Sequence, residues 1–575
     1  MSESLPHPAP GAVPWYLQGW HPRAILFVIG LAVLLPGTAA LPLMDRDEPR
    51  FAQATWEMIE RGEWFVPYFN GEYRFDKPVL SYWWMRIHDV ILGKTELASR
   101  LHSVFSAILT ALVILEIGAG LFSRRAGFWA GVGWLTCLQV LIHGRLCVAD
   151  MPMLFGLTVA FWGMLRLLEE VEEPPRWGKW FWVLAGGLAF GFLAKGPIAL
   201  AVPLAAFLLA RFALHRQPIA WRRLQPLSLI GIVLMMVGLW GIPALIKTQG
   251  KFWEVGMGEH VVHRGMESFN GRFRLPVIYY LFTALLSLLP WSAFLPAAWP
   301  KPEPRWKWSR KEALLLGWVL GPILIFGLYA TQLPHYIMPG FPAFFLLLFR
   351  AGPEALTKVG KWFWISLGNI LIPSTLIALW ASQIQIAEDA VGVRHLVVLG
   401  ALLFVCLGIW AFLARMQRWR LALAAVVVGG ILTASLTRVV RANHPAPKIL
   451  AALAEMNAKP RELRSWRYEE PNLVFYVTHP VKFKKKPNEI APSFAWAFEK
   501  ENRAAIFLLR EWRLQDEVNA LAAGRGFEPN PSQDHREAVT AALDPTRFAT
   551  RTVKGFNVAR ASWVELLVCA PKKAP

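Results

Sequence analysis

The sequence predicts an α-helical polytopic membrane protein of about thirteen transmembrane helices, followed by a soluble α/β domain. The chain has 575 residues, of which 55% are hydrophobic, and its mean hydropathy is +0.37. Apolar runs of about 20 residues, the length that crosses a bilayer, recur along the chain. Beyond residue 440 the apolar runs are too short to cross a membrane. We therefore divide the chain into a membrane domain, residues 1–440, and a soluble domain, residues 441–575.

The charge of the loops predicts how the spans are oriented. The spans are expected near residues 24–42, 98–120, 126–143, 148–168, 180–194, 197–213, 225–246, 276–298, 312–330, 335–350, 360–382, 394–413 and 420–438. The even-numbered connections are rich in lysine and arginine, which places them in the cytoplasm by the positive-inside rule. The odd-numbered connections, including the loops 43–97 and 247–275, are then expected on the outer side. An odd number of spans places the soluble domain on the outer side as well.

Composition also excludes some classes of protein. The formal net charge is +20, which in a soluble protein would be typical of nucleic-acid binding. In a chain this apolar, basic loops beside anionic lipids explain the charge better, so membrane lipids are expected as partners and nucleic acid is not. The four cysteines form no CxxC pair, so we predict neither a disulfide framework nor a thiolate metal site.

The soluble domain mixes helical and extended patterns. Residues 447–457 are predicted to form a helix. Residues 473–477 and 505–509 are short apolar runs that predict strands. The basic run at 483–486 is expected to be a solvated loop.

Charged residues gather at the predicted outer ends of the spans. Asp45, Asp47 and Glu48 follow the first span directly. Three further motifs also lie at span edges: Phe75-Asp-Lys-Pro78, Ala149-Asp-Met-Pro152 and Ala194-Lys-Gly-Pro197. Charged groups at membrane depth cost roughly 2.5–3.5 kcal/mol each, so such groups usually serve a function. We therefore predict a polar site on the outer face.

Structural explanations for these residues remain open. Asp47 precedes a segment with amphipathic helical spacing, so it could simply cap a helix that lies along the membrane surface, with Arg50 as its ion-pair partner. Asp150 could likewise cap a span. Lys195 could extend its ammonium group to the membrane surface. However, a lysine on the outer side opposes the charge bias of the loops, which favours a functional role.

A divalent metal is a weaker prediction. His260 and His263 are three residues apart in the 247–275 loop, where His260 could bind a metal together with Asp76. Two histidines alone are weak support for a metal site. No cofactor is otherwise expected to be required.

A sugar carried on a lipid phosphate would use this mixture of charges. Arg50, Lys77 and Lys195 could hold the phosphate and stabilise its charge as it leaves. A carboxylate could accept the proton of an acceptor hydroxyl. Nearby carboxylates would also stabilise the oxocarbenium-like state of the sugar.

The motifs resemble the bacterial aminoarabinose transferase family, which is related to the protein O-mannosyltransferases within the GT-C membrane glycosyltransferases. The resemblance spans nearly the whole chain and rests on Asp45-Arg-Asp-Glu-Pro-Arg-Phe-Ala52, Phe69-Asn-Gly-Glu-Tyr-Arg-Phe-Asp-Lys-Pro78, Arg145-Leu-Cys-Val-Ala-Asp-Met-Pro152, Leu193-Ala-Lys-Gly-Pro197 and Gln332-Leu-Pro-His-Tyr-Ile-Met-Pro339. It implies a GT-C bundle of thirteen spans in the bacterial inner membrane, with the active site and the C-terminal α/β domain in the periplasm. The implied reaction is inverting transfer of a sugar, such as 4-amino-4-deoxy-L-arabinose, from undecaprenyl phosphate to an acceptor such as lipid A.

The resemblance also implies roles for individual residues. Asp47, Glu48 and Asp150 correspond to catalytic positions. The donor phosphate would contact Arg50, Lys77 and Lys195, with Tyr336 beside it. The chain departs from the family at Phe51, where tyrosine is frequent, and at Asp76, where some members have glutamate. The second departure weakens the predicted metal contact at Asp76 and His260.

Other functions remain as alternatives. Protein O-glycosylation, as in the mannosyltransferases, is the nearest one. A lipid or anion transporter is less favoured, because transporters often show repeated halves and sites near the bilayer midplane. Here the charged motifs cluster at one interface. A purely structural membrane protein would leave the acidic loop without a purpose.

Overall fold

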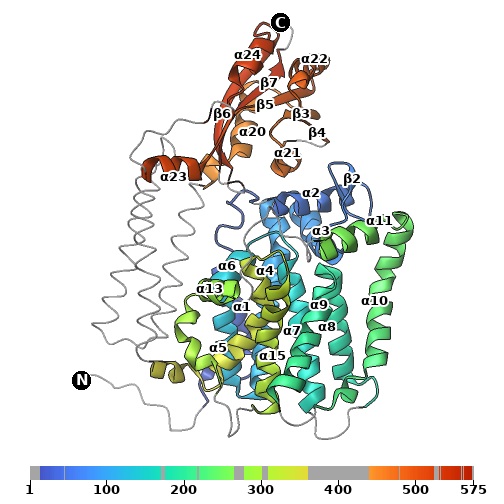
Figure 1. The fold of residues 1–575 in the computed structure, drawn as a ribbon, viewed down its shortest axis with the longest axis vertical. Coiled ribbons are helices and arrows are strands. Elements are labelled where there is room, and N and C mark those ends of the chain that lie inside the picture. Colours follow the sequence, from blue (N-terminus) through green and yellow to red (C-terminus); the bar gives the residue numbers. More distant parts are fainter. Residues whose placement is uncertain are drawn as a thin grey trace, which may run out of the picture.

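The computed structural model describes residues 13–44, 46–169, 175–215, 219–263, 278–300, 308–359, 440–477, 480–522, 530, 533–557, 560 and 562–572. A helical bundle forms the larger part, and a smaller α/β domain stands at one end of it (Figure 1). We call the end of the bundle nearest to this domain its upper end. The last three predicted spans, near 360–382, 394–413 and 420–438, lie outside the described residues.

The helices of the bundle follow the predicted apolar runs. They are α1 (His21–Leu34), α4 (Glu96–Leu121), α5 (Arg124–Leu135), α6 (Leu138–His143), α7 (Asp150–Glu169), α8 (Lys179–Lys195), α9 (Ile198–Leu208), α10 (Pro226–Lys247), α13 (Ile278–Ser287), α14 (Leu295–Ala298), α15 (Arg310–Leu328) and α16 (Phe341–Phe349). Helical turns extend several of them: η1 (Trp15–Leu17), η2 (Leu209–Leu214), η3 (Trp221–Leu224), η6 (Trp291–Phe294), η7 (Pro334–Gly340) and η8 (Pro353–Val359). The predicted pattern of apolar segments is therefore confirmed over the described residues.

Some predicted spans are shorter or broken. Within the described residues, four helices are long and apolar enough to cross a membrane, and a fifth span results if the pair bent by 111° at residues 278–298 counts as one. Helix α1 ends at Leu34 rather than at residue 42. Pro36 cannot continue the helical hydrogen bonds, and Gly37 has a φ of +87°, which turns the chain away.

Helices α7 and α8 pack at unusually short range. A Cβ atom at Gly163 would lie 2.5 Å from the backbone nitrogen of Leu184, and one at Gly187 would lie 2.4 Å from that of Ala160. Glycine at these positions lets the two backbones approach, as is common between helices in membranes. The pair is antiparallel, so the first residue of α7 and the last residue of α8 meet at the upper end.

The connection from α1 to α4 folds onto this upper end. It contains α2 (Asp47–Glu60), the hairpin β1 (Tyr68–Phe69) and β2 (Glu72–Tyr73), and α3 (Leu80–Leu92). Helix α2 begins at Asp47, as expected for a helix start with acidic residues and proline in its first turn. Its apolar face, which includes Phe51, Thr55 and Met58, is buried, which confirms the predicted amphipathic helix.

A buried ion pair fixes this connection to the bundle. Glu48 of α2 and Arg100 of α4 have fully buried side chains. Arg100 Nε and Nη2 each donate to the Glu48 carboxylate at 2.8 Å. The backbone amides of Met44 and Cys147 donate to the same carboxylate, at 2.6 and 2.7 Å.

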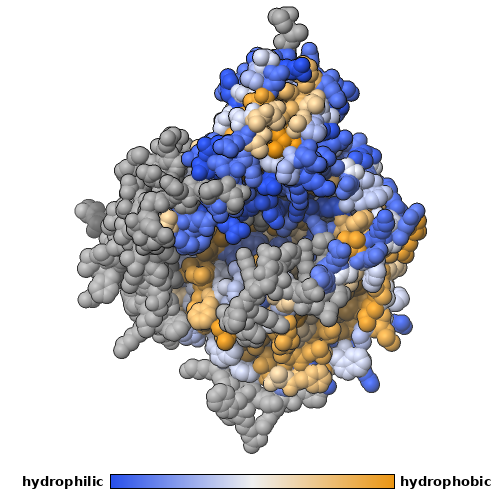
Figure 2. All heavy atoms as spheres, turned by 45° about the horizontal axis from the view of Figure 1, so that its top comes forward, coloured by the Kyte–Doolittle hydropathy of each residue, from blue (hydrophilic) through white to orange (hydrophobic). Residues whose placement is uncertain are grey.

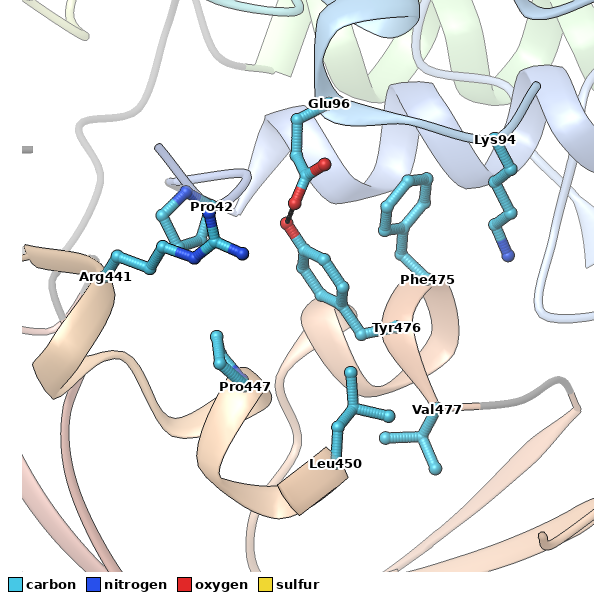
Figure 3. A pocket seen from close by; sticks show the side chains of 9 residues that line it. All are labelled: Pro42, Lys94, Glu96, Arg441, Pro447, Leu450, Phe475, Tyr476 and Val477. Atoms are coloured by element: carbon cyan, nitrogen blue, oxygen red, sulfur yellow. Dashed lines mark hydrogen bonds between the residues drawn. The ribbon is translucent and has the colours of Figure 1, made fainter. Parts of the chain in front are cut away.

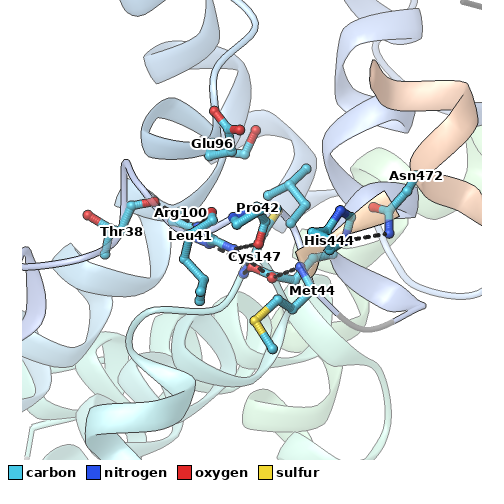
Figure 4. Close-up of polar contacts among 12 residues, drawn as sticks. Thr38, Leu41, Pro42, Met44, Glu96, Arg100, Cys147, His444 and Asn472 are labelled. Atoms are coloured by element: carbon cyan, nitrogen blue, oxygen red, sulfur yellow. Dashed lines mark hydrogen bonds and ion pairs between the residues drawn. The ribbon is translucent and has the colours of Figure 1, made fainter. Parts of the chain in front are cut away.

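The remaining donors of Arg100 hold the preceding backbone. They bond to the carbonyl oxygens of Thr38, Leu41 and Pro42, at 2.5–2.8 Å (Figure 4). One guanidinium thus determines where the segment that leads into α2 lies.

The C-terminal domain is built on a mixed five-stranded sheet. Its elements are α20 (Pro445–Glu455), β3 (Glu462–Trp466), α21 (Pro471–Tyr476), β4 (Val481–Lys484), η9 (Pro487–Glu489), α22 (Ile490–Phe498), β5 (Arg503–Arg513), α23 (Leu514–Ala522), α24 (Arg536–Ala542), β6 (Phe548–Asn557) and β7 (Ser562–Pro571). The strand order is β4-β3-β5-β7-β6. β3 is parallel to both β4 and β5, whereas β7 is antiparallel to β5 and β6. The predicted α/β character, the helix at 447–457 and the strand at 505–509 are confirmed.

Two local predictions in this domain are wrong. Residues 473–477 were expected to be a strand, but they belong to helix α21 and the turn after it. Pro471 at the first helical position favours a helix start, and the apolar residues that follow pack into the core on consecutive positions. The basic run at 483–486 was expected to be a loop, but its first two residues end strand β4. This strand lies at the sheet edge, where lysines are frequent.

The C-terminal domain contacts the upper end of the bundle through α21 and β4. The Tyr476 hydroxyl accepts a hydrogen bond from the Leu43 amide at 2.8 Å and donates one to Glu96 at 3.0 Å. The Asn70 side chain exchanges two hydrogen bonds with the backbone of Val481, at 2.6 and 2.8 Å. We call this contact region the joint.

The hydropathy of the surface differs between the C-terminal domain and the helical bundle. Figure 2 shows hydrophilic residues over much of the C-terminal domain and in a band beneath it, while hydrophobic residues predominate on the bundle below. Several side chains of α10 are largely exposed, among them Leu227, Leu239 and Ile246. An exposed apolar helix of this kind is what a lipid environment accommodates.

The Glu48–Arg100 pair predicts a large stability effect. Arg100→Met should leave a buried carboxylate without its cation, at a cost of about 3–5 kcal/mol. Thermal unfolding of the purified chain in detergent measures this as a lower melting temperature. Arg23→Met is the matched control, because the Arg23–Glu116 pair is partly exposed and such pairs contribute little. Equal melting temperatures for the two variants would contradict the assigned role of Arg100.

Candidate active site

A cavity of about 530 Å³ opens at the upper end of the bundle. Its lining combines a small charged end with a long apolar wall. The charged and hydroxyl-bearing side chains are those of Asp76, Lys77, Asp150, Lys195, Tyr329, His335 and Tyr336. The sequence had indicated five of these seven residues, all but Tyr329 and His335.

Asp150 and Lys195 form an ion pair at the charged end. Asp150 begins α7 and Lys195 ends α8, so the close antiparallel packing of these helices brings the two side chains together. The carboxylate at a helix N-terminus and the ammonium at a C-terminus also match the helix dipoles. Lys195 Nζ lies 5.9 Å from the centre of the Tyr336 ring. The ion pair therefore holds the Lys195 ammonium at the wall of the cavity.

Two histidines extend the charged end into the bundle, and the sequence analysis had not identified them as site residues. His335 Nε2 lies 3.9 Å from Asp150 Oδ1. The rings of His335 and His143 are 4.7 Å apart, and Gln139 Nε2 lies 2.9 Å from His143 Nδ1. His335 directly precedes Tyr336 in a motif already noted, and Gln139 and His143 are spaced i, i+4 on α6. Buried polar residues at helical spacing were therefore the signal that could have found them.

Another part of the lining comes from the segment before α3. The buried side chain of Arg74 pairs with Asp76 at 2.9 Å and donates to the Tyr82 hydroxyl at 3.0 Å. The Arg74 guanidinium also lies 5.0 Å from the centre of the Phe51 ring. Arg74 was missed by the sequence analysis. It orients Asp76 and thereby the adjacent Lys77.

Asp47 and Arg50 lie near this wall but do not line the cavity. Asp47 is exposed at the start of α2 and interacts electrostatically with Arg50. Burial, together with the nearby Arg74, lowers the pKa of the Arg50 guanidinium from its usual value. Asp45 lies outside the described residues.

Glu48 is not accessible in this structure. It had been grouped with Asp47 as a catalytic residue, but its side chain is fully buried and engaged by Arg100. Adjacent residues on a helix point about 100° apart. Asp47 therefore faces outward while Glu48 faces the bundle, so the geometry supports a structural rather than a catalytic role for Glu48.

The predicted metal ligands do not form a complete donor set in the described part of the chain. The Asp76 carboxylate is paired with Arg74. His260 lies in the helical turn η4 (Glu254–His263), which follows α11 (Lys251–Trp253). The side chain of His260 is not among the parts of the chain that the structure describes. Among the described residues, no group of three or more histidine, cysteine, aspartate or glutamate side chains could hold a metal ion.

The apolar wall of the cavity runs along α10. It includes Leu234, Val237, Gly238, Gly241, Ile242 and Leu245. Only 17% of the most apolar part of this helix segment is buried within the protein. A ligand with a charged head and a long apolar tail fits this division: the head at the two lysines and the tail along α10.

Comparison with known proteins agrees with this geometry. The chain matches the family described as dolichyl-phosphate-mannose-protein mannosyltransferase over residues 76–240. An undecaprenyl phosphate-α-4-amino-4-deoxy-L-arabinose arabinosyl transferase 2 of Sodalis glossinidius is 31% identical over 414 residues, which cover 69% of this chain and 73% of that protein. The corresponding transferase of an Enterobacter species is 30% identical, with 70% and 74% covered. The chain belongs to this family of arabinosyl transferases.

A solved structure shows the same fold. The crystal structure of ArnT from Cupriavidus metallidurans bound to undecaprenyl phosphate superposes with a TM-score of 0.68, at 18% identity, over 95% of this chain and 97% of that one. The fold of this chain is thus that of the GT-C membrane glycosyltransferases, as the sequence predicted.

The Asp150–Lys195 pair can be tested by a double-mutant cycle. Asp150→Asn and Lys195→Met should each lower the melting temperature, because each leaves one charge without its partner; we expect about 1–3 kcal/mol per variant. The double variant should lose less than the sum of the two. Thermal unfolding of the ligand-free protein measures all four states. Strict additivity would show that the two side chains do not interact.

Proposed function

We propose that this chain transfers 4-amino-4-deoxy-L-arabinose from undecaprenyl phosphate to lipid A, with inversion at the sugar C1 atom. The observation that carries the proposal is a largely apolar cavity whose lining includes both Lys77 and Lys195. A polyprenyl phosphate has the matching division between an anionic head and an apolar tail. Family membership, with relatives named for this donor, supports the choice of donor.

The two lysines hold the donor phosphate in this proposal. Lys195 is fixed by Asp150 and Lys77 by its position beside the anchored Asp76, so the cations need little rearrangement when the phosphate arrives. Preorganised cations stabilise the charge that develops on a leaving phosphate more than the charge in the ground state. Arg50 supplies further positive charge near this wall, and Tyr336 packs beside Lys195.

Asp47 is the proposed general base. Its carboxylate is exposed, whereas the Asp150 carboxylate is already engaged by Lys195. An acceptor oxygen attacks C1 from the face opposite the phosphate and gives its proton to Asp47. The bond between C1 and the phosphate oxygen breaks, and undecaprenyl phosphate leaves with the electron pair. This sequence inverts the configuration at C1.

We place the reaction at the periplasmic face of the inner membrane. The basic loops predicted for the cytoplasmic side are the support for this orientation. The proposed reaction uses side chains of the chain itself, so we expect transfer to continue in the presence of a chelator such as EDTA.

The decisive experiment for the function is mass spectrometry of envelope lipids and glycoproteins from cells with and without this chain. We expect lipid A to lose a 4-amino-4-deoxy-L-arabinose substituent when the chain is absent. Loss of a sugar from proteins alone would instead establish protein O-glycosylation, the alternative that the mannosyltransferase match favours. Unchanged glycosylation of all acceptors would favour a transporter.

Asp47→Asn tests the general base. The amide keeps the shape of the side chain but cannot accept the proton, so transfer should fall by about 10²–10⁴-fold. A transfer assay in vesicles that contain donor and lipid A measures the rate, and membrane insertion should be unchanged. Wild-type activity in this variant would remove Asp47 from the mechanism.

Lys77→Ala tests the phosphate contact. Loss of one preorganised cation should lower kcat/KM for the donor by about 10²–10³-fold. Lys77→Arg should recover part of this loss, because it restores the charge but not the position of the ammonium. If Lys77→Ala leaves both the donor KM and kcat unchanged, Lys77 does not contact the phosphate.

A further inference from the structure

A second cavity lies at the joint between the bundle and the C-terminal domain. Its volume is about 570 Å³. Pro42, Lys94 and Glu96 line it from the bundle side, and Arg441, Pro447, Leu450, Phe475, Tyr476 and Val477 line it from the other side (Figure 3). We call it the joint cavity. It shares none of its lining residues with the cavity that contains Lys77 and Lys195.

Lys94 is one of the two cations that line this cavity. It lies in the short connection between α3 and α4, and it makes neither a hydrogen bond nor an ion pair with any described residue. Its ammonium lies 4.8 Å from the centre of the Phe475 ring. Burial lowers the pKa of Lys94 to about 8, although Glu60, Glu57 and Asp89 partly oppose this. The Lys94 ammonium thus lies beside an aromatic ring rather than in a direct ion pair with a described residue.

Arg441 is the second cation of the lining, and it is exposed. Its side chain has no hydrogen-bond or ion-pair partner in the described part of the chain. Figure 3 shows Arg441 and Lys94 on opposite sides of Tyr476, from the C-terminal domain and the bundle respectively. The lining of the cavity therefore contains one cation from each of the two parts of the protein that it joins.

The single carboxylate in the lining is already engaged. Glu96 accepts the hydrogen bond of the Tyr476 hydroxyl at 3.0 Å. With Lys94 and Arg441 protonated and Glu96 ionised, the lining carries a net positive charge. Lysine and arginine side chains bind phosphate groups through charge-assisted hydrogen bonds.

The joint cavity adjoins the segment that carries the proposed base. Pro42 lines the cavity, and the Tyr476 hydroxyl accepts a hydrogen bond from the amide of Leu43. Asp47 follows Leu43 by four residues. A headgroup held in the joint cavity would thus lie beside the segment that leads into Asp47.

We propose that the joint cavity binds a phosphate group of the acceptor glycolipid, with Lys94 and Arg441 as its ligands. This inference rests on the proposed function, because it assigns the acceptor side of the same reaction. The donor phosphate lies at Lys77 and Lys195, so the two anionic substrates have separate cation pairs. The apolar residues of the lining, such as Leu450 and Val477, suit the less polar parts of a lipid headgroup.

Binding is tested first, independently of catalysis. The full chain is purified in detergent, and native mass spectrometry measures how much lipid A with two phosphates it retains. The double variant Lys94→Ala, Arg441→Ala should retain about tenfold less or lower, since each charged hydrogen bond contributes to affinity. Lys482→Ala is the matched control, because Lys482 is an exposed lysine of the C-terminal domain outside the cavity. It should retain as much lipid A as the wild type.

Two probes distinguish the source of the phosphate. Fully dephosphorylated lipid A should bind wild type and double variant equally weakly. Millimolar inorganic phosphate should displace little intact lipid A, because the lipid also uses the apolar lining. Complete displacement at that concentration would overturn the lipid site and identify a site for free phosphate instead.

Transfer kinetics provide the second arm. The double variant should raise the KM for lipid A about tenfold or more while leaving the KM for the donor unchanged. The charge-conserving variant Lys94→Arg, Arg441→Lys should restore most of the acceptor affinity. Retention of lipid A equal to that of the wild type would overturn the proposal, and so would an equal rise in both KM values, which would indicate a general disturbance of the joint. If wild-type protein retains lipid A through Lys94 and Arg441 but transfers no sugar to it, the proposed function fails and the binding site stands.

Discussion

Close packing of α7 against α8 is the constraint on which the site depends. Glycines at the contact let the two backbones approach within a distance that any side chain would prevent. Because the helices are antiparallel, this contact places Asp150 and Lys195 at the same end of the bundle. The lysine would otherwise be free to extend toward water. Held by the carboxylate, it faces a cavity whose far wall is apolar, and this contrast makes the site suitable for an anionic lipid.

The buried ion pair between Glu48 and Arg100 fixes the position of the first loop in the same way. Arg100 binds Glu48 and three backbone carbonyls, so the segment from Thr38 to Glu48 has little freedom. Asp47, one residue earlier, remains exposed because the helix turns it outward. The two neighbouring acids thus have different tasks: one holds the loop and the other is available to a substrate. The C-terminal domain reaches the same segment through Tyr476, whose hydroxyl bonds to the Leu43 amide and to Glu96.

Much of the fold and part of the site could be predicted from the sequence. Apolar length located the spans, because a membrane helix carries its signal within one continuous segment. Charges at span edges located Lys77, Asp150 and Lys195, the family resemblance added Tyr336, and all four line one cavity. Other features depend on contacts between distant segments, which no local pattern encodes. Nothing in the local sequence distinguishes Arg100 from other basic residues of a helix, and its structural role follows only from its contact with Glu48. The place of His335 in the site likewise follows only from its distance to Asp150. The prediction of a strand at 473–477 was wrong because Pro471 and burial in the domain core favour a helix there.

We propose that the donor phosphate lies between Lys77 and Lys195 while its tail follows α10. An electron cryomicroscopy structure of the full chain with undecaprenyl phosphate in a lipid nanodisc would show where both parts of the lipid bind. We expect density for the phosphate within hydrogen-bond distance of both ammonium groups, and density for the first prenyl units against Leu234, Val237 and Ile242. Phosphate density in the joint cavity, or a tail that runs on another side of the bundle, would contradict it.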